Sequence, residues 1–199
     1  FVESCNAKRI QFIAYNRSWD IPTLSSVACD HQNGGQMVAE YFVKNNHQSI
    51  GLIEGPKGSF VSDERSRGFK QYLKSLKKIK LITEKGFFTY EGGYQAAEKI
   101  LKNKKISAIF CADDTMAFGS LDYIKKNTNL KIPKNLELIG YDDISMSNWK
   151  SYDLTTVRQP IRQMSKLVTQ LIDEFIQDPD YESINHIVKG RLVMRRTTR

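Results

Sequence analysis

Hydrophobic and polar positions follow two alternating patterns along this chain. Short apolar runs are each followed by a longer stretch in which apolar residues recur at helical spacing. The first pattern is typical of buried strands and the second of amphipathic helices. We therefore expect strands at 10–15, 25–29, 50–54, 81–87, 107–112, 136–142, 154–159 and 186–194. Helices are expected at 1–8, 32–44, 63–76, 91–102, 115–126 and 160–177.

Strands that alternate with long helices predict an α/β fold with a mainly parallel, doubly wound sheet. The helix at 160–177 has the clearest apolar stripe, formed by Ile161, Met164, Leu167, Val168, Leu171, Ile172 and Phe175. This stripe needs a surface to pack on, and residues 1–29 offer only two short strands and part of a helix. We infer that the sequence lacks its front end.

Composition is typical of a soluble globular protein, with 40% hydrophobic and 26% charged residues. We find no apolar run of membrane-spanning length and no signal-peptide pattern at 1–10. The three cysteines, Cys5, Cys29 and Cys111, are odd in number and have no Cys-x-x-Cys spacing. They indicate free thiols in a reducing compartment, so a cytoplasmic location is expected.

The formal charge of +8 permits a nucleic-acid partner. However, the basic residues are spread over segments 74–80, 102–105 and 191–199, without interleaved aromatic residues. Solvated helix faces explain this distribution better than a DNA-binding surface on this chain.

No pattern of catalytic or cofactor chemistry is present. The chain has no phosphate-binding loop, no Gly-x-Gly-x-x-Gly, no Gly-x-Ser-x-Gly and no His-Glu-x-x-His. The pairs Asp113-Asp114 and Asp142-Asp143 suggest a divalent cation, but neighbours at a strand end point in opposite directions. Each pair should give one inward carboxylate and one helix cap. We therefore expect no enzyme activity, no metal and no cofactor.

A binding site remains. Residues just past the carboxyl ends of parallel strands, or in the first turn of the next helix, share one edge of the sheet. Four such residues are Arg65, Phe88, Asp113 and Asp142. A guanidinium, two carboxylates and an aromatic face suit a small polyhydroxylated ligand, because charged groups bind its hydroxyls and the ring covers an apolar C–H face.

Each of these residues has a structural alternative. Arg65 can pair with acidic neighbours on its own helix. Asp113 can cap the helix that follows it, in competition with Asp114, and Phe88 can belong to the core. Asp142 is the strongest candidate, because nothing in the local pattern demands an acid there, whereas Tyr141 is expected only to pack.

Four segments together resemble the lactose/galactose-repressor family of bacterial transcription regulators. They are Asp63-Glu-Arg-Ser-Arg-Gly-Phe69, Phe110-Cys-Ala-Asp-Asp-Thr-Met-Ala-Phe-Gly119, Ile139-Gly-Tyr-Asp-Asp-Ile144 and Leu154-Thr-Thr-Val-Arg-Gln-Pro160. Shorter similarities in the family's order extend over nearly the whole chain.

The resemblance implies a type I periplasmic-binding-protein-like fold, in which three chain crossings join two α/β lobes around a cleft for a sugar or other small effector. A partial N-terminal lobe would comprise 1–29 and 159–185, and the C-terminal lobe 30–158 and 186–199. Closure of the cleft by effector would rotate the lobes of a homodimer.

The family's ligand positions match Asn16, Arg65, Phe88, Asp113 and Asp142, with Cys29 and Gln159 as weaker matches. Family members commonly have Asn where this chain has Asp113, so the ligand's hydroxyl pattern is expected to differ there. Operator DNA would be bound through an N-terminal helix-turn-helix that is absent from this chain, and no membrane is involved. The alternative is a periplasmic-type sugar-binding protein for uptake.

Overall fold

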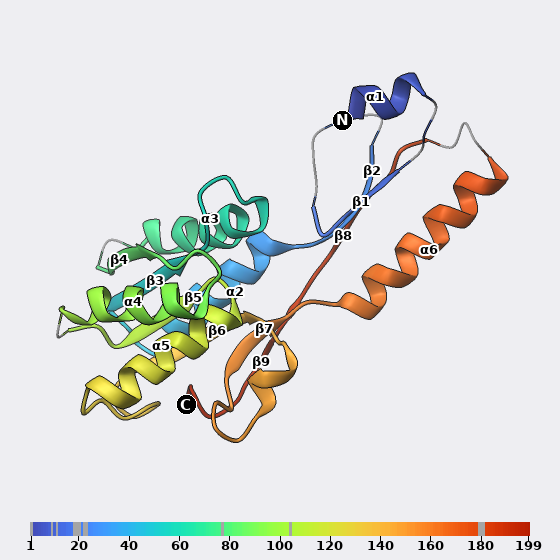
Figure 1. The fold of residues 1–199 in the computed structure, drawn as a ribbon. Coiled ribbons are helices and arrows are strands. Elements are labelled where there is room, and N and C mark those ends of the chain that lie inside the picture. The colour runs from blue at the N-terminus through green and yellow to red at the C-terminus, as the bar shows by residue number, and fades with distance from the viewer. Residues whose placement is uncertain are drawn as a thin grey trace. The chain divides into compact units, whose positions relative to one another are not determined.

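The computed structural model of the chain describes residues 2–8, 10, 12–17, 21, 24–76, 78–103, 105–178 and 182–199 (Figure 1). Two compact units are formed: unit 1 comprises Phe1–Asp30 and Pro160–Gly190, and unit 2 comprises His31–Gln159 and Arg191–Arg199. The predicted lobe boundaries fall after residues 29, 158 and 185. The observed ones fall after residues 30, 159 and 190, which is one, one and five residues later.

Unit 2 is built on a six-stranded sheet in the order β4-β3-β5-β6-β7-β9. Its strands are β3 (Ser49–Glu54), β4 (Lys80–Lys85), β5 (Ala108–Cys111), β6 (Glu137–Asp142), β7 (Thr155–Arg158) and β9 (Arg191–Val193). The first five strands in the sheet order are parallel, and β9 runs antiparallel to β7. The predicted α/β class with a mainly parallel sheet is confirmed.

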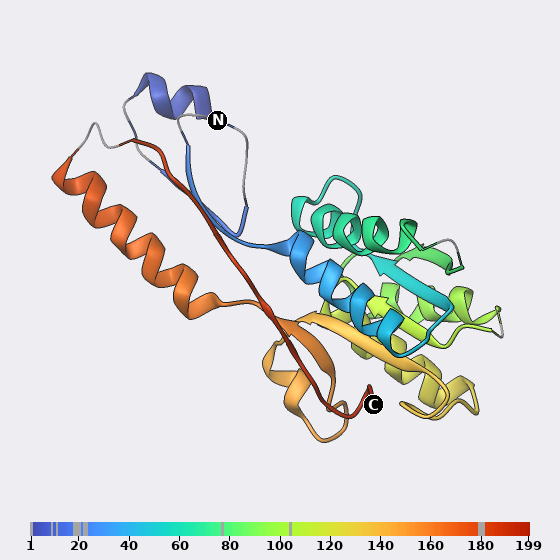
Figure 2. The same cartoon turned by 180° about the vertical axis from the view of Figure 1, so that it is seen from behind.

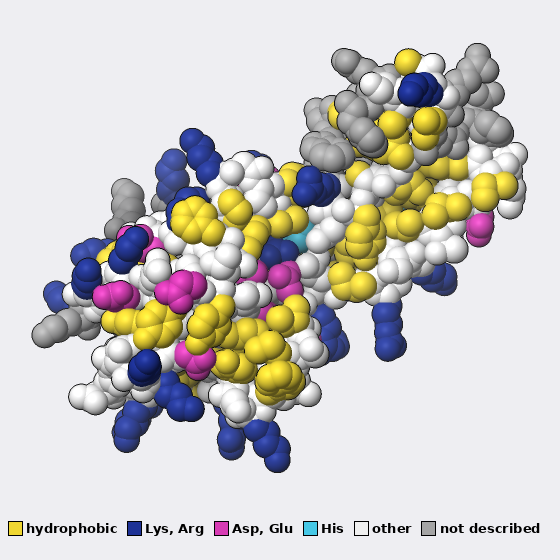
Figure 3. All heavy atoms as spheres, in the orientation of Figure 1, with side chains coloured by type: hydrophobic (Ala, Val, Ile, Leu, Met, Phe, Trp, Pro, Cys, Tyr) yellow, Lys and Arg dark blue, Asp and Glu magenta, His cyan; other side chains and the backbone are white. Residues whose placement is uncertain are grey.

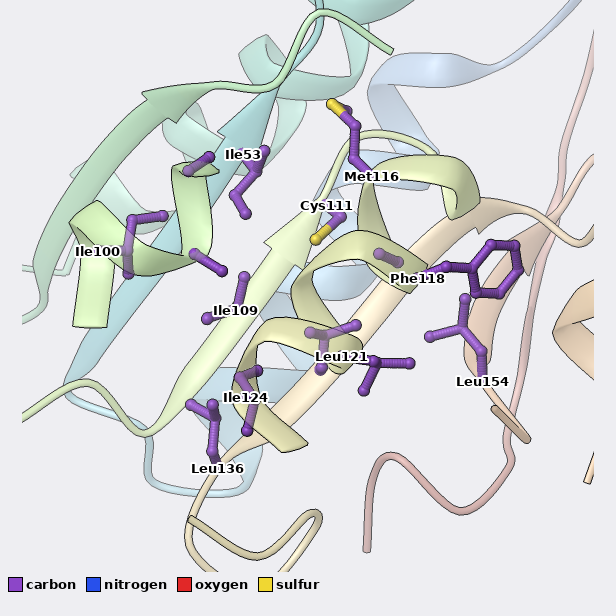
Figure 4. Packing of buried hydrophobic residues seen from close by; sticks show 14 of the residues in the cluster. Ile53, Ile100, Ile109, Cys111, Met116, Phe118, Leu121, Ile124, Leu136 and Leu154 are labelled. Atoms are coloured by element: carbon purple, nitrogen blue, oxygen red, sulfur yellow. The ribbon is translucent and has the colours of Figure 1, made fainter. Parts of the chain in front are cut away.

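Helices cover both faces of this sheet (Figures 1 and 2). They are α2 (His31–Lys44), α3 (Phe60–Lys74), α4 (Tyr90–Leu101) and α5 (Asp114–Asn127). Because successive side chains of a strand point to opposite faces, Leu52 packs with α2 and α3 whereas Ile53 packs with α4 and α5. Figure 4 shows Ile53, Ile109 and Met116 in the second of these cores. Strands that are apolar on both faces explain the unbroken hydrophobic runs of the sequence.

Unit 1 contains a three-stranded parallel sheet in the order β1-β2-β8. Its elements are α1 (Val2–Ala7), β1 (Ile13–Tyr15), β2 (Ser25–Cys29), α6 (Ile161–Gln177) and β8 (Asn185–Val188). The predicted α6 stripe is only partly covered. Met164 and Leu171 are buried against β2 and β8, while Ile161 and Ile172 remain exposed.

The prediction of one final strand at 186–194 is wrong. The segment forms two strands, because β8 pairs with β2 in unit 1 and β9 pairs with β7 in unit 2. Lys189 and Gly190 lie between them. The apolar pattern of residues 186–194 does not show that the chain passes from one sheet to the other. The one sequence signal is Gly190, because glycine weakens the interior of a strand.

Among the residues that the structure describes, no helix is long and apolar enough to cross a bilayer. Lysine and arginine side chains are dispersed over the face seen in Figure 3. This distribution agrees with the expectation of solvated helix faces.

Candidate functional site

Arg65 organises the carboxyl edge of the unit 2 sheet. It is only 2% exposed, and its Nη2 donates to Oδ1 of Asp142 at 2.8 Å while Nη1 donates to the carbonyl of Ala112 at 2.7 Å. Because α3 begins at Phe60, Arg65 lies in the second turn and not in the first as expected. The alternative pairing on its own helix is not seen; Glu64 pairs with Arg67 instead.

Two aromatic side chains complete the surroundings of Arg65. Its guanidinium carbon lies 3.9 Å from the centroid of the Tyr141 ring, which is cation–π geometry. Its Nε donates to Nδ1 of His31 at 3.4 Å, and the Tyr141 hydroxyl is 3.3 Å from the same nitrogen. Tyr141 packs in the core as predicted and also contacts Arg65. His31 was missed, because no sequence motif marks it.

Asp142 ends β6 and receives two hydrogen bonds on one oxygen. Nε2 of Gln159 donates to Oδ1 at 2.6 Å, next to the bond from Arg65. The second oxygen, Oδ2, accepts no hydrogen bond from the residues that the structure describes. Burial raises the pKa of Asp142, although the Arg65 charge and the Gln159 amide oppose this. Its φ of 116° is rare outside glycine, so the backbone is strained at this site.

Gln159 has an unused acceptor. Its side chain is buried, and Oε1 has no hydrogen-bond partner among the described residues. A buried amide oxygen without a donor costs free energy, so Oε1 is an acceptor that a bound water or ligand can use. The predicted residues Arg65, Asp142 and Gln159 therefore form one hydrogen-bonded network.

Asp113 is the N-cap of α5. Its Oδ1 accepts from the backbone N–H of Met116 at 2.8 Å, which is the structural alternative noted from the sequence. The side chain is close enough to Asp142 and Arg65 for both charges to act on it. Burial, together with the Asp142 charge, raises the pKa of Asp113 to about 6, against the opposing Met116 N–H and Arg65.

Asp114 is the inward acid of the first pair. It accepts from the hydroxyls of Thr156 and Ser147, both at 2.6 Å, and from the N–H of Ile144 at 3.0 Å. Burial raises its pKa to about 7, with these hydrogen bonds opposing. Asp114 thereby fixes the segment that leads from β6 into the short 3-10 helix η1 (Ser145–Asn148). The expectation of one inward acid and one cap holds for this pair.

The second pair differs from that expectation. Asp143 caps no helix, since η1 has Ile144 as its N-cap. Instead Oδ1 of Asp143 pairs with Nη2 of Arg195 at 2.6 Å, and Oδ2 pairs with Arg158. The prediction of a cap at 142–143 is wrong, because two arginines from β7 and the end of the chain take up this carboxylate.

Phe88 follows β4 with a φ of 59°. It is partly buried against the core between the sheet and α4 and α5. A Cβ at Gly55, just past the end of β3, would clash with its ring, so glycine is required there. The ring thus covers the end of the neighbouring strand, and packing accounts for part of its surface.

Two predicted residues belong to unit 1. Asn16 follows β1 with a φ of 57°, and its N–H donates to the carbonyl of Val27 at 2.8 Å. Cys29 ends β2 and is buried with Met164 and Leu171. Its packing favours a structural role for this thiol.

The chemistry of the network is that of binding. It offers oriented acceptors, a guanidinium and an aromatic ring. Within the described ranges, no group of three or more histidines, cysteines and acids is arranged to hold a metal ion. Fold and site together are those of an α/β domain with a candidate site for a small molecule.

A family profile described as a periplasmic binding protein-like domain matches residues 39–198. The chain therefore belongs to the periplasmic binding protein-like domain family, and the resemblance to regulators of the lactose/galactose-repressor family is confirmed by its relatives.

Among curated proteins, the probable HTH-type transcriptional repressor ExuR of Bacillus subtilis (strain 168) is 29% identical over 205 residues, covering 100% of this chain and 60% of that protein. The HTH-type transcriptional repressor PurR of Vibrio vulnificus (strain CMCP6) is 31% identical over 172 residues, covering 84% of this chain and 51% of its own length. The chain thus spans about half to 60% of these relatives.

Solved structures agree with this family. A LacI family transcriptional regulator from Enterococcus faecalis V583 with bound ribose has a TM-score of 0.87 and 28% identity, covering 98% of this chain and 71% of that one. The lactose repressor bound to the anti-inducer ONPF has a TM-score of 0.84 and 26% identity, covering 94% and 69%.

Proposed function

We propose that this chain is the effector-binding part of a bacterial transcription repressor, and that its effector is a sugar or a related polyhydroxylated compound. The observation that carries this proposal is the network of Arg65, Asp142 and Gln159. One oxygen of Asp142 and Oε1 of Gln159 are still without hydrogen-bond donors among the described residues. Hydroxyl groups of a ligand supply such donors.

The rigid placement of the network supports binding. Arg65 is held by three hydrogen-bond partners and by the Tyr141 ring, so the Asp142 carboxylate is already oriented. A preformed site loses little conformational entropy when it binds its ligand. Phe88 would cover an apolar face of the sugar, and Asp113 would accept from another hydroxyl. Asn16 of unit 1 remains a predicted contact, and Cys29 a weaker one.

The relatives favour a regulator over an uptake protein. Both curated relatives described above are named as HTH-type transcriptional repressors. By this proposal the whole protein binds operator DNA through an N-terminal helix-turn-helix, works in the cytoplasm and catalyses no reaction. Effector binding would change its affinity for the operator.

A homodimer is part of the proposal, and one surface of unit 2 suits it. Here we define the aromatic face as Tyr90, Tyr94, Tyr123, Trp149 and Tyr152. Hydrophobic side chains gather over α4 and α5 in Figure 3. The hydroxyls of Tyr90 and Tyr152 both donate to Oδ2 of Asp122, at 2.7 and 3.2 Å, which connects α4, α5 and the segment after η1. Aromatic residues of this kind are enriched at protein interfaces.

The dimer is tested by sedimentation of the full-length protein. Trp149 is 55% exposed, so Trp149→Ser should weaken dimerisation without unfolding the subunit. Met194→Ser, which removes an exposed apolar side chain outside the aromatic face, serves as the control. Equal dimer stability in both variants would exclude this face.

The effector is tested with full-length protein by a thermal-shift screen of sugars and nucleobases, followed by calorimetric titration of the best ligand. Loss of a charged hydrogen bond in Asp142→Asn should raise its Kd about tenfold or more. Glu98→Gln, an exposed acid on α4, is the control and should leave the Kd unchanged. An unchanged Kd in Asp142→Asn would place the effector elsewhere. Release of operator DNA by the same ligand, measured by gel shift, tests the regulator.

A further inference from the structure

Segment 195–199 is bound to unit 2 at the edge of the sheet where β6 and β7 begin, opposite to the proposed effector site. The backbone N–H of Leu138 donates to the carbonyl of Thr197 at 3.0 Å, and the N–H of Thr155 donates to the Thr197 hydroxyl at 2.8 Å. The hydroxyls of Thr155 and Thr198 are 2.7 Å apart. Both Thr197 and Thr198 are buried. The segment therefore packs across the first residues of two strands.

A buried acid lies beneath the end of this segment. Glu137 begins β6 and is 0% exposed. Because strand residues alternate between faces, its side chain lies on the same face as Ile139, in the core beside α2 and α3. The Arg199 Nε lies 3.0 Å from Oε1 of Glu137, and the Tyr41 hydroxyl donates to the Arg199 carbonyl at 2.7 Å. Arg199 thus connects β6 with α2, outside the aromatic face on α4 and α5.

A buried histidine contacts the same carboxylate oxygen. Nε2 of His47 lies 3.5 Å from Oε1 of Glu137, and Nδ1 lies 2.9 Å from the Ser107 hydroxyl. The Phe42 ring packs edge-on against the imidazole at 5.5 Å. Within the described part of the chain, neither Nε2 nor the two Glu137 oxygens form a hydrogen bond. His47 and Arg199 therefore approach one oxygen that neither fully satisfies.

The charges of this cluster balance only while His47 is neutral. Arg199 and Glu137 then form one cation and one anion, whereas protonated His47 would place a second cation beside the same buried carboxylate. Burial lowers the pKa of His47; Glu137 opposes this change, and the Arg199 charge adds to the lowering. Tyr41 stays protonated near neutral pH, because burial raises its pKa above the ordinary 10.0. His47 is thus the group of the cluster that a moderate fall in pH would charge.

We propose that segment 195–199 is held by a proton-controlled clasp, which we define as Glu137, His47 and Arg199. When His47 is neutral, Glu137 binds Arg199 and the segment is docked. When His47 takes up a proton from solvent, the imidazolium binds the carboxylate, Arg199 moves into water and the segment detaches from β6 and β7. Docking is favoured above the ordinary histidine pKa of 6.5 and weakens as the pH falls below it. The clasp does not depend on the identity of the effector.

The first test measures amide hydrogen exchange of the full-length protein by NMR. The amides of Leu138 and Thr155 report docking directly, because both donate to Thr197. After correction for intrinsic exchange rates, their protection should fall about threefold or more between about pH 8 and about pH 5.5. The amide of Ala112 donates to the carbonyl of Ile53 on the neighbouring strand and should keep its protection.

Two histidine variants separate the clasp from general effects of pH. The side chain of His47→Gln takes up no proton in this range, so protection of the two amides should no longer depend on pH. His186→Gln, in β8 of unit 1, is the matched control and should keep the dependence of the natural protein. An equal dependence in His47→Gln would overturn the proposal, as would unchanged or greater protection of the natural protein at the lower pH.

Arg199→Gln tests the same competition from the other side. The Arg199 side chain is 63% exposed, so the variant changes the charge with little loss of packing. Because coupling between two sites is reciprocal, the variant should raise the pKa of His47, read from its imidazole signals over a pH titration. Lys44→Gln, which removes an exposed lysine from the last turn of α2, should leave this pKa unchanged. An unchanged or lower pKa in Arg199→Gln would show that His47 and Arg199 do not compete, and would overturn the clasp.

Discussion

The two acid pairs at the ends of β5 and β6 look alike in the sequence, yet their members do different work. The second members, Asp114 and Asp143, are buried and have both oxygens bound, by hydroxyls and an N–H in one case and by two arginines in the other. The first members, Asp113 and Asp142, each show one oxygen engaged by a hydrogen bond.

Under the proposed function, the second members of the pairs support the structure and the first members contact the ligand. Asp114 and Asp143 hold the chain just past the ends of β5 and β6, next to Asp113 and Asp142. Asp113 and Asp142 keep acceptor capacity and lie within reach of each other's charge. Removing a second member should therefore reduce stability, and removing a first member should affect ligand binding more than folding.

The largest effect is expected for Asp143→Ala. The Arg195 guanidinium is mostly buried against Asp143, so the variant leaves a buried charge without its partner. Breaking a pair of this kind costs about 3 kcal/mol of unfolding free energy, measured by urea denaturation. Asp153→Ala is the control, because its partner Arg196 is exposed and the loss should stay below about 1 kcal/mol. Similar losses in both variants would contradict the structural role of Asp143.

Asp114→Asn should cost less, about 2 kcal/mol at pH 6. The loss should shrink above about pH 7, because the pKa of Asp114 is raised to about 7 by burial and asparagine removes the cost of burying the charged form. The amide keeps an acceptor for Thr156, but its NH₂ group faces the N–H of Ile144 and the hydroxyl of Ser147, which then compete as donors. Urea denaturation measures the loss. Thr156→Val removes one donor and leaves Oδ1 of Asp114 without that partner, so it measures the cost of losing this single hydrogen bond. Unchanged stability in Asp114→Asn would show that the segment after β6 is held by other contacts.

Much of this arrangement could be predicted from the sequence, because it depends on local patterns. Apolar periodicity located the strands and helices, and parallel topology placed Arg65, Asp113 and Asp142 at one edge. What could not be predicted depends on contacts distant in sequence. His31 meets Arg65 across 34 positions, and Asp143 meets Arg195 across 52. Neither partner has a motif, so only the folded chain reveals the pairing.

The assignment of caps was also beyond local reasoning. Both acids of the pair at 113–114 are good N-cap residues, and the sequence does not distinguish between them. The hydroxyls of Thr156 and Ser147, which come from distant segments, engage Asp114 and leave the cap to Asp113.

The smallest effect is expected for Asp113→Asn, and it has the opposite sign. Burial raises the pKa of Asp113 from 3.8 to about 6, so the folded chain binds its proton more tightly than the unfolded chain. Between about pH 4 and pH 6 the stability of the natural protein should fall as pH rises, since the folded state holds more protons there. Asparagine removes this dependence and keeps an acceptor for Met116, because Asn and Asp are equally good caps.

Asp113→Asn should therefore be more stable than the natural protein by about 1–2 kcal/mol at pH 7.5 and about equal to it near pH 4. Urea denaturation at the two pH values measures the difference, with Glu98→Gln as an exposed acid control. A loss of stability at pH 7.5 would mean that the negative charge at the N-terminus of α5 outweighs its burial. In that case Asp113 would belong with the supporting acids, and only Asp142 would remain as a carboxylate for recognition.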